Sequence, residues 1–160
     1  MLIVLGLRRL KCNIVVVSDG VPPIEALYAE LGCHVVSDEG RSPADVKAEL
    51  LKLYELGYDY TFECNSYLTY GAVALEVCHK GWGQCGLLAA PDKASDMIET
   101  RPFQLVTGRH WVGALLANMQ FGELFDADLA ATRSGPILLN ILTKIFNTHK
   151  PISIKKFTKN

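Results

Sequence analysis

Short runs of apolar and β-branched residues alternate, over most of the chain, with stretches whose apolar residues recur at helical spacing. The runs show little polar–apolar alternation, which is typical of strands buried on both faces of a sheet. Helical segments separate them, as right-handed βαβ units require. The pattern therefore predicts an α/β fold with a parallel sheet and helices on both faces. The strands are expected at Ile14–Ser18, Cys33–Ser37, Tyr60–Cys64, Cys85–Ala90 and Arg109–Leu116.

Turn and capping residues mark the helices between these strands. Ser42 is placed to cap a helix that has Pro43 at its first position and Asp45 at its third. An earlier helix is expected between Pro22 and Gly32, because proline suits a first helical turn and glycine suits a helix end. A third is expected over the almost wholly apolar segment Tyr67–Cys78.

Composition narrows the classes of function. The 160 residues are 49% hydrophobic and 21% charged, with a formal net charge of −1. This predicts one domain with a core and no electrostatic footprint for nucleic acid. The longest apolar runs are too short to cross a bilayer, and basic residues follow the first run instead of preceding it, so we expect a cytoplasmic protein without a membrane contact. Five cysteines without a C-x-x-C pair predict buried, reduced thiols.

The end of the chain differs in charge from the rest. Beyond Asp128 there is no acidic residue, and six basic residues follow. The segment predicts either a helix over Pro136–Phe146 with a solvated basic end, or a patch that faces an anion. The basic residues are Arg133, Lys144, Lys150, Lys155, Lys156 and Lys159.

Two motifs suggest nucleotide chemistry. The stretch Gly81–Gly86 spells G-x-G-x-x-G, but it lies between an expected helix and an expected strand, the reverse of the dinucleotide-binding context, so it predicts a tight turn. Asp19 follows an expected strand, where a carboxylate binds the ribose hydroxyls of NAD in such folds, although an Asp-Gly pair is also a common turn. The histidines have no metal-ligand spacing; His79 is expected to cap a helix end.

Three segments resemble one enzyme family closely. They are Phe62–Cys64, Ala74–Gly83 (ALEVCHKGWG) and Thr100–Arg109 (TRPFQLVTGR). They are similar to the zinc-dependent medium-chain alcohol dehydrogenases, above all the class III or S-(hydroxymethyl)glutathione dehydrogenases. The resemblance extends more loosely from about Gly6 to Gly113. It implies a Rossmann-like cofactor domain, hydride transfer from an alcohol to NAD, and a dimer formed through the last strand.

The resemblance also assigns cofactor-binding residues. Asp19 falls on the family's ribose-binding acid. The positions that fall on the nicotinamide side of the cleft are Asn65, Leu88, Ala89, Ala90, Ala114, Leu115 and Leu116.

The departures from the family are as informative. Its zinc ligands and catalytic domain have no counterpart here, nor does its first strand with the glycine-rich turn; the match begins inside the following helix. We therefore expect a partial NAD-binding domain over residues 1–116, a divergent helical and basic segment over 117–160, no metal site and no catalytic residue. NAD binding is expected to be weak or lost. The alternative is a non-catalytic remnant that pairs with another dehydrogenase subunit.

The missing strand is the central one of the family's 3-2-1-4-5-6 sheet. Each backbone group orphaned at a buried strand edge costs about 1–3 kcal/mol. Three outcomes are open: the strand at Ile14 pairs with that at Tyr60, another element fills the gap, or the chain is only marginally folded.

Overall fold

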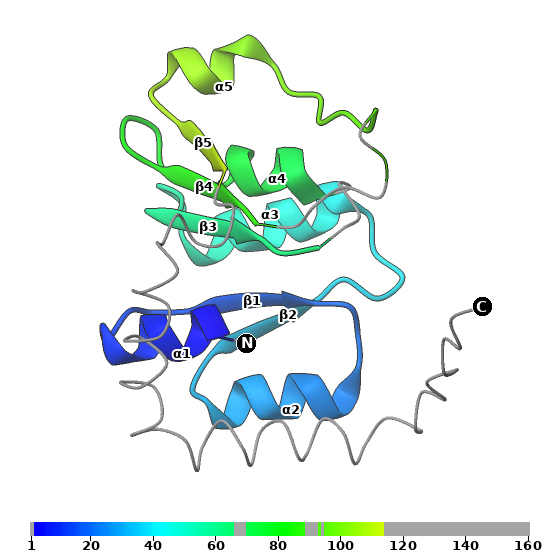
Figure 1. The fold of residues 1–160 in the computed structure, drawn as a ribbon. Helices are drawn as coiled ribbons and strands as arrows, with labels where there is room; N and C mark the ends of the chain where they lie inside the picture. Colours follow the sequence, from blue (N-terminus) through cyan, green and yellow to red (C-terminus); the bar gives the residue numbers. More distant parts are fainter. Residues whose placement is uncertain (1, 66–69, 89–92, 94, 114–160) are drawn as a thin grey trace, which may run out of the picture. The chain divides into compact units, whose positions relative to one another are not determined.

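The computed structural model describes residues 2–65, 70–88, 93 and 95–113 (Figure 1). These fall into two compact units, one up to Val35 and one from Val36 onward. The predicted boundary between residues 116 and 117 lies outside the described residues, as does the basic segment beyond Asp128. No helix within the described ranges is long and apolar enough to span a bilayer.

The first unit contains α1 (Leu2–Arg9), β1 (Val15–Ser18) and α2 (Pro22–Glu30). Helix α1 confirms that the chain is already helical at Gly6. Helix α2 ends as predicted, because Gly32 adopts a left-handed φ of 73° and its N–H donates to the carbonyl of Ala29 at 2.8 Å. Strand β2 (His34–Ser37) spans the unit boundary and forms a two-stranded sheet with β1.

The second unit begins with α3 (Pro43–Leu53), whose predicted start is confirmed. The Asp45 N–H donates to the Ser42 hydroxyl oxygen at 3.2 Å, and the Ser42 N–H donates to the Asp45 carboxylate at 3.3 Å. The Ser42 side-chain hydrogen bond lowers the pKa of Asp45. This reciprocal arrangement is a capping box, so local sequence alone fixes where α3 begins.

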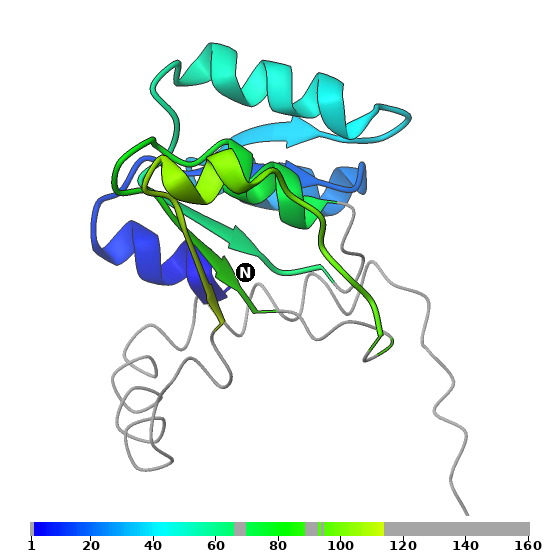
Figure 2. The same cartoon turned by 90° about the horizontal axis from the view of Figure 1, so that it is seen from above.

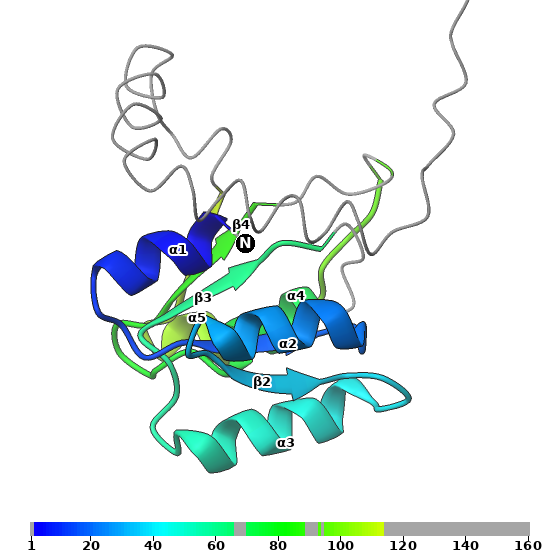
Figure 3. The ribbon, with the colours of Figure 1, turned by 90° about the horizontal axis from the view of Figure 1, so that it is seen from below.

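Strands β3 (Tyr60–Glu63), β4 (Gln84–Leu87) and β5 (His110–Gly113) form a parallel sheet in that order. Phe62, Gly86 and Val112 lie in register across it. The arrows of β3 and β4 point in the same direction from above and from below (Figures 2 and 3). The predicted α/β fold with parallel strands is confirmed.

Two short helices complete the unit. Helix α4 (Gly71–Glu76) forms part of the predicted helix over Tyr67–Cys78. Helix α5 (Pro102–Val106), which precedes β5, was not predicted. Leu75 of α4 is fully buried with Cys78 and Cys85, and Trp111 packs against them.

The five thiols are free, but their predicted burial is only partly right. Cys33, Cys78 and Cys85 are buried, whereas Cys12 and Cys64 are exposed. Cys12 lies in the turn after α1 and Cys64 follows the end of β3, so neither faces a core.

The glycine-rich stretch is a tight turn between α4 and β4, as predicted from its context. A Cβ on Gly83 would lie 2.5 Å from the backbone nitrogen of His79, and one on Gly108 would lie 2.7 Å from the carbonyl oxygen of Gly81. The glycines therefore allow backbone segments to approach each other and do not form a phosphate cradle.

The division into two sheets matches the family's strand order with its central strand left out. Strand β1 pairs with β2, while β3 pairs with β4, so the described residues contain no direct pairing of β1 with β3. The first of the three outcomes expected from the sequence is therefore not the one observed.

Arg109 ties the second unit together. Its side chain is 7% exposed and donates through Nε to the Cys78 carbonyl at 2.8 Å and through Nη1 to Oε1 of Gln104 at 2.7 Å. Nη2 donates to the Glu76 carbonyl at 3.2 Å. The guanidinium thus joins the carboxyl end of α4, where a cation is favoured, to α5 and to the start of β5.

We expect Arg109→Met to destabilise the chain by about 3 kcal/mol or more, because each buried acceptor left without a donor costs about 1–3 kcal/mol. Urea unfolding of the full chain measures this. The matched control is Arg41→Met, which removes a partly exposed ion pair with Glu49 (2.6 Å) and hydrogen bonds to the Ser37 and Asp45 carbonyls. Because water can replace these partners at the surface, the control should cost less than Arg109→Met, about 1 kcal/mol. Equal losses for the two variants would contradict the role given to Arg109.

Candidate functional site

The candidate cofactor residues lie at the carboxyl ends of parallel strands, where α/β folds bind nucleotides. In the first unit, Asp19 directly follows β1 and its side chain is exposed. Gly20 adopts a φ of 79° and turns the chain toward α2. The Asp-Gly pair is thus a turn, as one interpretation of the sequence expected, and it also presents an exposed carboxylate.

The start of α2 beside Asp19 offers little to a phosphate. Pro22 and Pro23 have no N–H, and the N–H groups of Ile24 and Glu25 both donate to the Val21 carbonyl, at 2.9 and 3.0 Å. A helix start binds phosphate through free N–H groups. The turn therefore suits ribose hydroxyls better than a phosphate group.

In the second unit, Asn65 and Leu88 come together through Glu63. The Leu88 N–H donates to the Glu63 carbonyl at 3.0 Å, and the Asn65 N–H donates to Glu63 Oε1 at 2.6 Å. These bonds fix the chain where it leaves β3 and β4. The other five predicted positions, Ala89, Ala90, Ala114, Leu115 and Leu116, lie outside the described residues.

Glu63 is the residue that sequence reasoning missed. It is 6% exposed at the carboxyl end of β3. Burial raises the pKa of its carboxyl group, and the hydrogen bond from the Asn65 N–H opposes that rise. The sequence did contain a signal, because Glu63 is an acidic residue near the end of the run Tyr60–Cys64. An acidic residue in that position marks a carboxyl group at the edge of the sheet where α/β folds bind ligands.

No group of three or more His, Cys, Asp or Glu side chains could hold a metal ion within the part of the chain that the structure covers. Asp19 is an exposed carboxylate of the kind that can accept hydrogen bonds from ribose hydroxyls. Of the described connections, none runs from a strand through a glycine-rich turn into a helix, the arrangement that holds a dinucleotide's pyrophosphate.

Comparison with known proteins agrees with the resemblance seen in the sequence. No family model matches the chain. It is 36% identical over 118 residues to S-(hydroxymethyl)glutathione dehydrogenase from Aspergillus oryzae, covering 74% of this chain and 30% of the relative. The enzyme of the same name from Escherichia coli O1:K1 is 32% identical over 118 residues, covering 74% and 32%.

Solved structures show the same fold. A benzyl alcohol dehydrogenase from Acinetobacter calcoaceticus superposes with a TM-score of 0.66 at 14% identity, over 77% of this chain and 33% of that one. An alcohol dehydrogenase zinc-binding domain protein from Burkholderia ambifaria gives 0.55 at 24% identity, over 63% and 26%.

These matches make the chain a homologue of part of the S-(hydroxymethyl)glutathione dehydrogenases, with a Rossmann-like α/β fold. The chain spans about a third of the length of the curated relatives it matches.

The buried Glu63 carboxyl predicts a dependence of stability on pH. Because its pKa is raised in the folded chain, the folded state favours the protonated form, and stability falls as the pH rises above about 4.3, the ordinary value for Glu. Glu63→Gln keeps an oxygen for the Asn65 N–H and removes the charge. We expect urea unfolding to show the variant at least as stable as the wild type at pH 7, with an advantage that shrinks toward pH 4.

The control for this comparison is Glu39→Gln, which removes an exposed carboxylate and should change stability equally at the two pH values. A Glu63→Gln chain that is less stable than the wild type at pH 7 would show that the ionised carboxylate stabilises the fold.

Proposed function

We propose, from its homology to the S-(hydroxymethyl)glutathione dehydrogenases, that this chain provides part of the NAD-binding region of an alcohol dehydrogenase. The proposal rests above all on Asp19, an exposed carboxylate at the carboxyl end of β1. A carboxylate there accepts hydrogen bonds from the ribose hydroxyls of NAD and repels the additional phosphate of NADP. In a complete dehydrogenase the cofactor accepts hydride and zinc polarises the alcohol oxygen.

The proposal includes weak cofactor binding and no catalysis by the 160-residue chain alone. Asp19 would contribute to ribose recognition and Asn65 to the nicotinamide side, but the pyrophosphate lies between these two parts of the cofactor. Without a helix start aimed at it, the most highly charged part of NAD gains little from the described residues. Contacts to the ribose alone supply only a small part of the free energy of NAD binding.

Isothermal titration of the full chain tests this. We expect NADH to bind with a Kd of about 1 mM or weaker, NADPH to bind more weakly still, and Asp19→Asn to remove the difference between them. Glu55→Gln, which removes an exposed carboxylate between α3 and β3, should leave the preference unchanged. Micromolar affinity for NADH would overturn the proposal of weak cofactor binding. NADH production from an alcohol with added zinc would overturn the proposal that the isolated chain is inactive.

A second function is favoured by the outer edge of β5. This strand is last in the order of its sheet, and Val112 is 40% exposed. The His110 N–H donates inward to Gly83 at 3.0 Å, so the alternating N–H groups of Trp111 and Gly113 face outward. We propose that this edge pairs with the corresponding strand of a second copy or of a full-length dehydrogenase subunit.

Gly113→Pro tests strand pairing, because proline removes one outward N–H without touching a bond to β4. We expect it to abolish a dimer seen by sedimentation, or co-purification with a full-length dehydrogenase subunit. Gly113→Ala is the matched control: a Cβ there meets nothing within 4 Å, and the N–H is kept. If neither association occurs in the wild-type chain, or if the proline variant still associates, pairing through β5 is wrong.

A further inference from the structure

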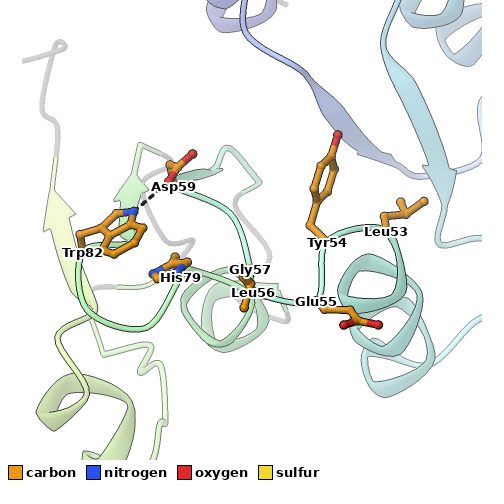
Figure 4. A pocket seen from close by; sticks show the side chains of 8 residues that line it. All are labelled: Leu53, Tyr54, Glu55, Leu56, Gly57, Asp59, His79 and Trp82. Carbon is orange, nitrogen blue, oxygen red and sulfur yellow. Dashed lines mark hydrogen bonds between the residues drawn. The ribbon is translucent and has the colours of Figure 1, made fainter.

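A shallow hollow of about 490 Å³ lies in the second unit at the amino ends of β3 and β4 (Figure 4). Asp59 directly precedes β3, and Trp82 lies two residues before β4. The candidate cofactor residues Asn65 and Leu88 follow the other ends of the same strands. The hollow is therefore separate from the site proposed above.

Large apolar side chains line the hollow without being covered by the described residues. Leu56 is 78% exposed and Trp82 is 59% exposed, and Leu53 and Tyr54 are also exposed. Single exposed apolar residues are common on protein surfaces, but several gathered around one concavity are typical of interaction sites. Tryptophan and tyrosine are also enriched among the residues that carry most of the binding free energy in interfaces.

Trp82 is held in place by two contacts. Its ring stacks on that of His79, with centroids 3.6 Å apart and planes inclined by 15°. Its Nε1–H donates to Oδ1 of Asp59 at 2.8 Å. Figure 4 shows the three side chains together on one side of the hollow, with Tyr54 and Leu53 on the other. The indole is thus oriented before any partner arrives, which lowers the entropic cost of binding.

The charge of the hollow is negative. Asp59 and Glu55 line it, while the nearby Lys52 and Lys80 do not. The hydrogen bond from Trp82 uses Oδ1 of Asp59 and leaves Oδ2 without a donor among the described side chains. A carboxylate beside an oriented indole favours a cation, because the ring face attracts positive charge and the carboxylate accepts its hydrogen bonds.

We infer that this hollow binds an arginine side chain that another protein presents next to apolar residues. The guanidinium group is planar, stacks on an indole and donates to a carboxylate, whereas an ammonium group is compact and strongly hydrated. Its aliphatic stem, with neighbouring apolar side chains, would cover Leu53 and Leu56. An anionic partner would meet the charges of Asp59 and Glu55, and a neutral apolar one would desolvate Asp59 without pairing it.

The test is an NMR titration of the full chain with the peptide acetyl-Leu-Arg-Leu-amide. The chain has two tryptophans, and their indole N–H signals provide a reporter and an internal control: Trp82 lines the hollow, and Trp111 packs against the core. We expect the Trp82 signal to move on titration and the Trp111 signal to stay. The same peptide with citrulline, which keeps the shape of arginine and loses its charge, should bind about tenfold more weakly.

Asp59→Asn keeps an oxygen for the indole N–H and removes the negative charge, so it should also weaken the arginine peptide about tenfold. The matched control Glu39→Gln should leave the affinity unchanged. A stationary Trp82 signal at millimolar peptide, equal binding of the citrulline peptide, or equal binding by Asp59→Asn would overturn the inference. So would a Trp82 signal that shifts with protein concentration alone, because the occupant would then be a second copy of this chain.

Discussion

The second unit depends on one buried cation. Arg109 contacts the end of α4 through the carbonyls of Glu76 and Cys78, and α5 through Gln104, so residues far apart in the sequence share one guanidinium. Arg109 is only 7% exposed, and burying its charge is costly. The fixed fork of donors on the guanidinium offsets that cost only when every acceptor is in place. This explains why the segment Thr100–Arg109 is distinctive in sequence: it contains both Arg109 and Gln104, which accepts a hydrogen bond from it. A lysine at position 109 could not reach the same set of acceptors.

The pairing of the strands follows a second constraint. In a 3-2-1-4-5-6 sheet the first strand joins the two halves, and the observed order, β1–β2 and β3–β4–β5, corresponds to the two halves without it. Each half keeps its own ladder of backbone hydrogen bonds because strands that follow one another in the sequence pair within it. The second unit also has its own core around Leu75, Cys78 and Cys85, and all three residues belong to that unit. Local pairing and a local core thus let each half keep its own strand order.

The sequence predicted those features whose cause is local. The apolar runs located all five strands, Ser42 and Asp45 fixed the start of α3, and the position of Gly81–Gly86 between a helix and a strand distinguished a turn from a phosphate site. It did not predict α5, a helix of only five residues that Arg109 holds through the side chain of Gln104. Nor did it predict the exposure of Cys12 and Cys64 or the burial of Glu63, since burial depends on which elements pack together. At the candidate site, Asp19, Asn65 and Leu88 lie where parallel strands end, as expected.

The two ends of the β3–β4–β5 sheet have different chemistry for a physical reason. At the carboxyl ends, Glu63 uses its side chain and its carbonyl to fix the backbone at Asn65 and Leu88, so that end is ordered by the chain's own hydrogen bonds. At the amino ends, the turn that brings Gly83 against His79 leaves no room for side chains between the segments and directs Trp82 outward. Close backbone approach at one end of the sheet thus exposes an aromatic ring there. The same glycines that exclude a phosphate cradle create the surface that the arginine-binding inference uses.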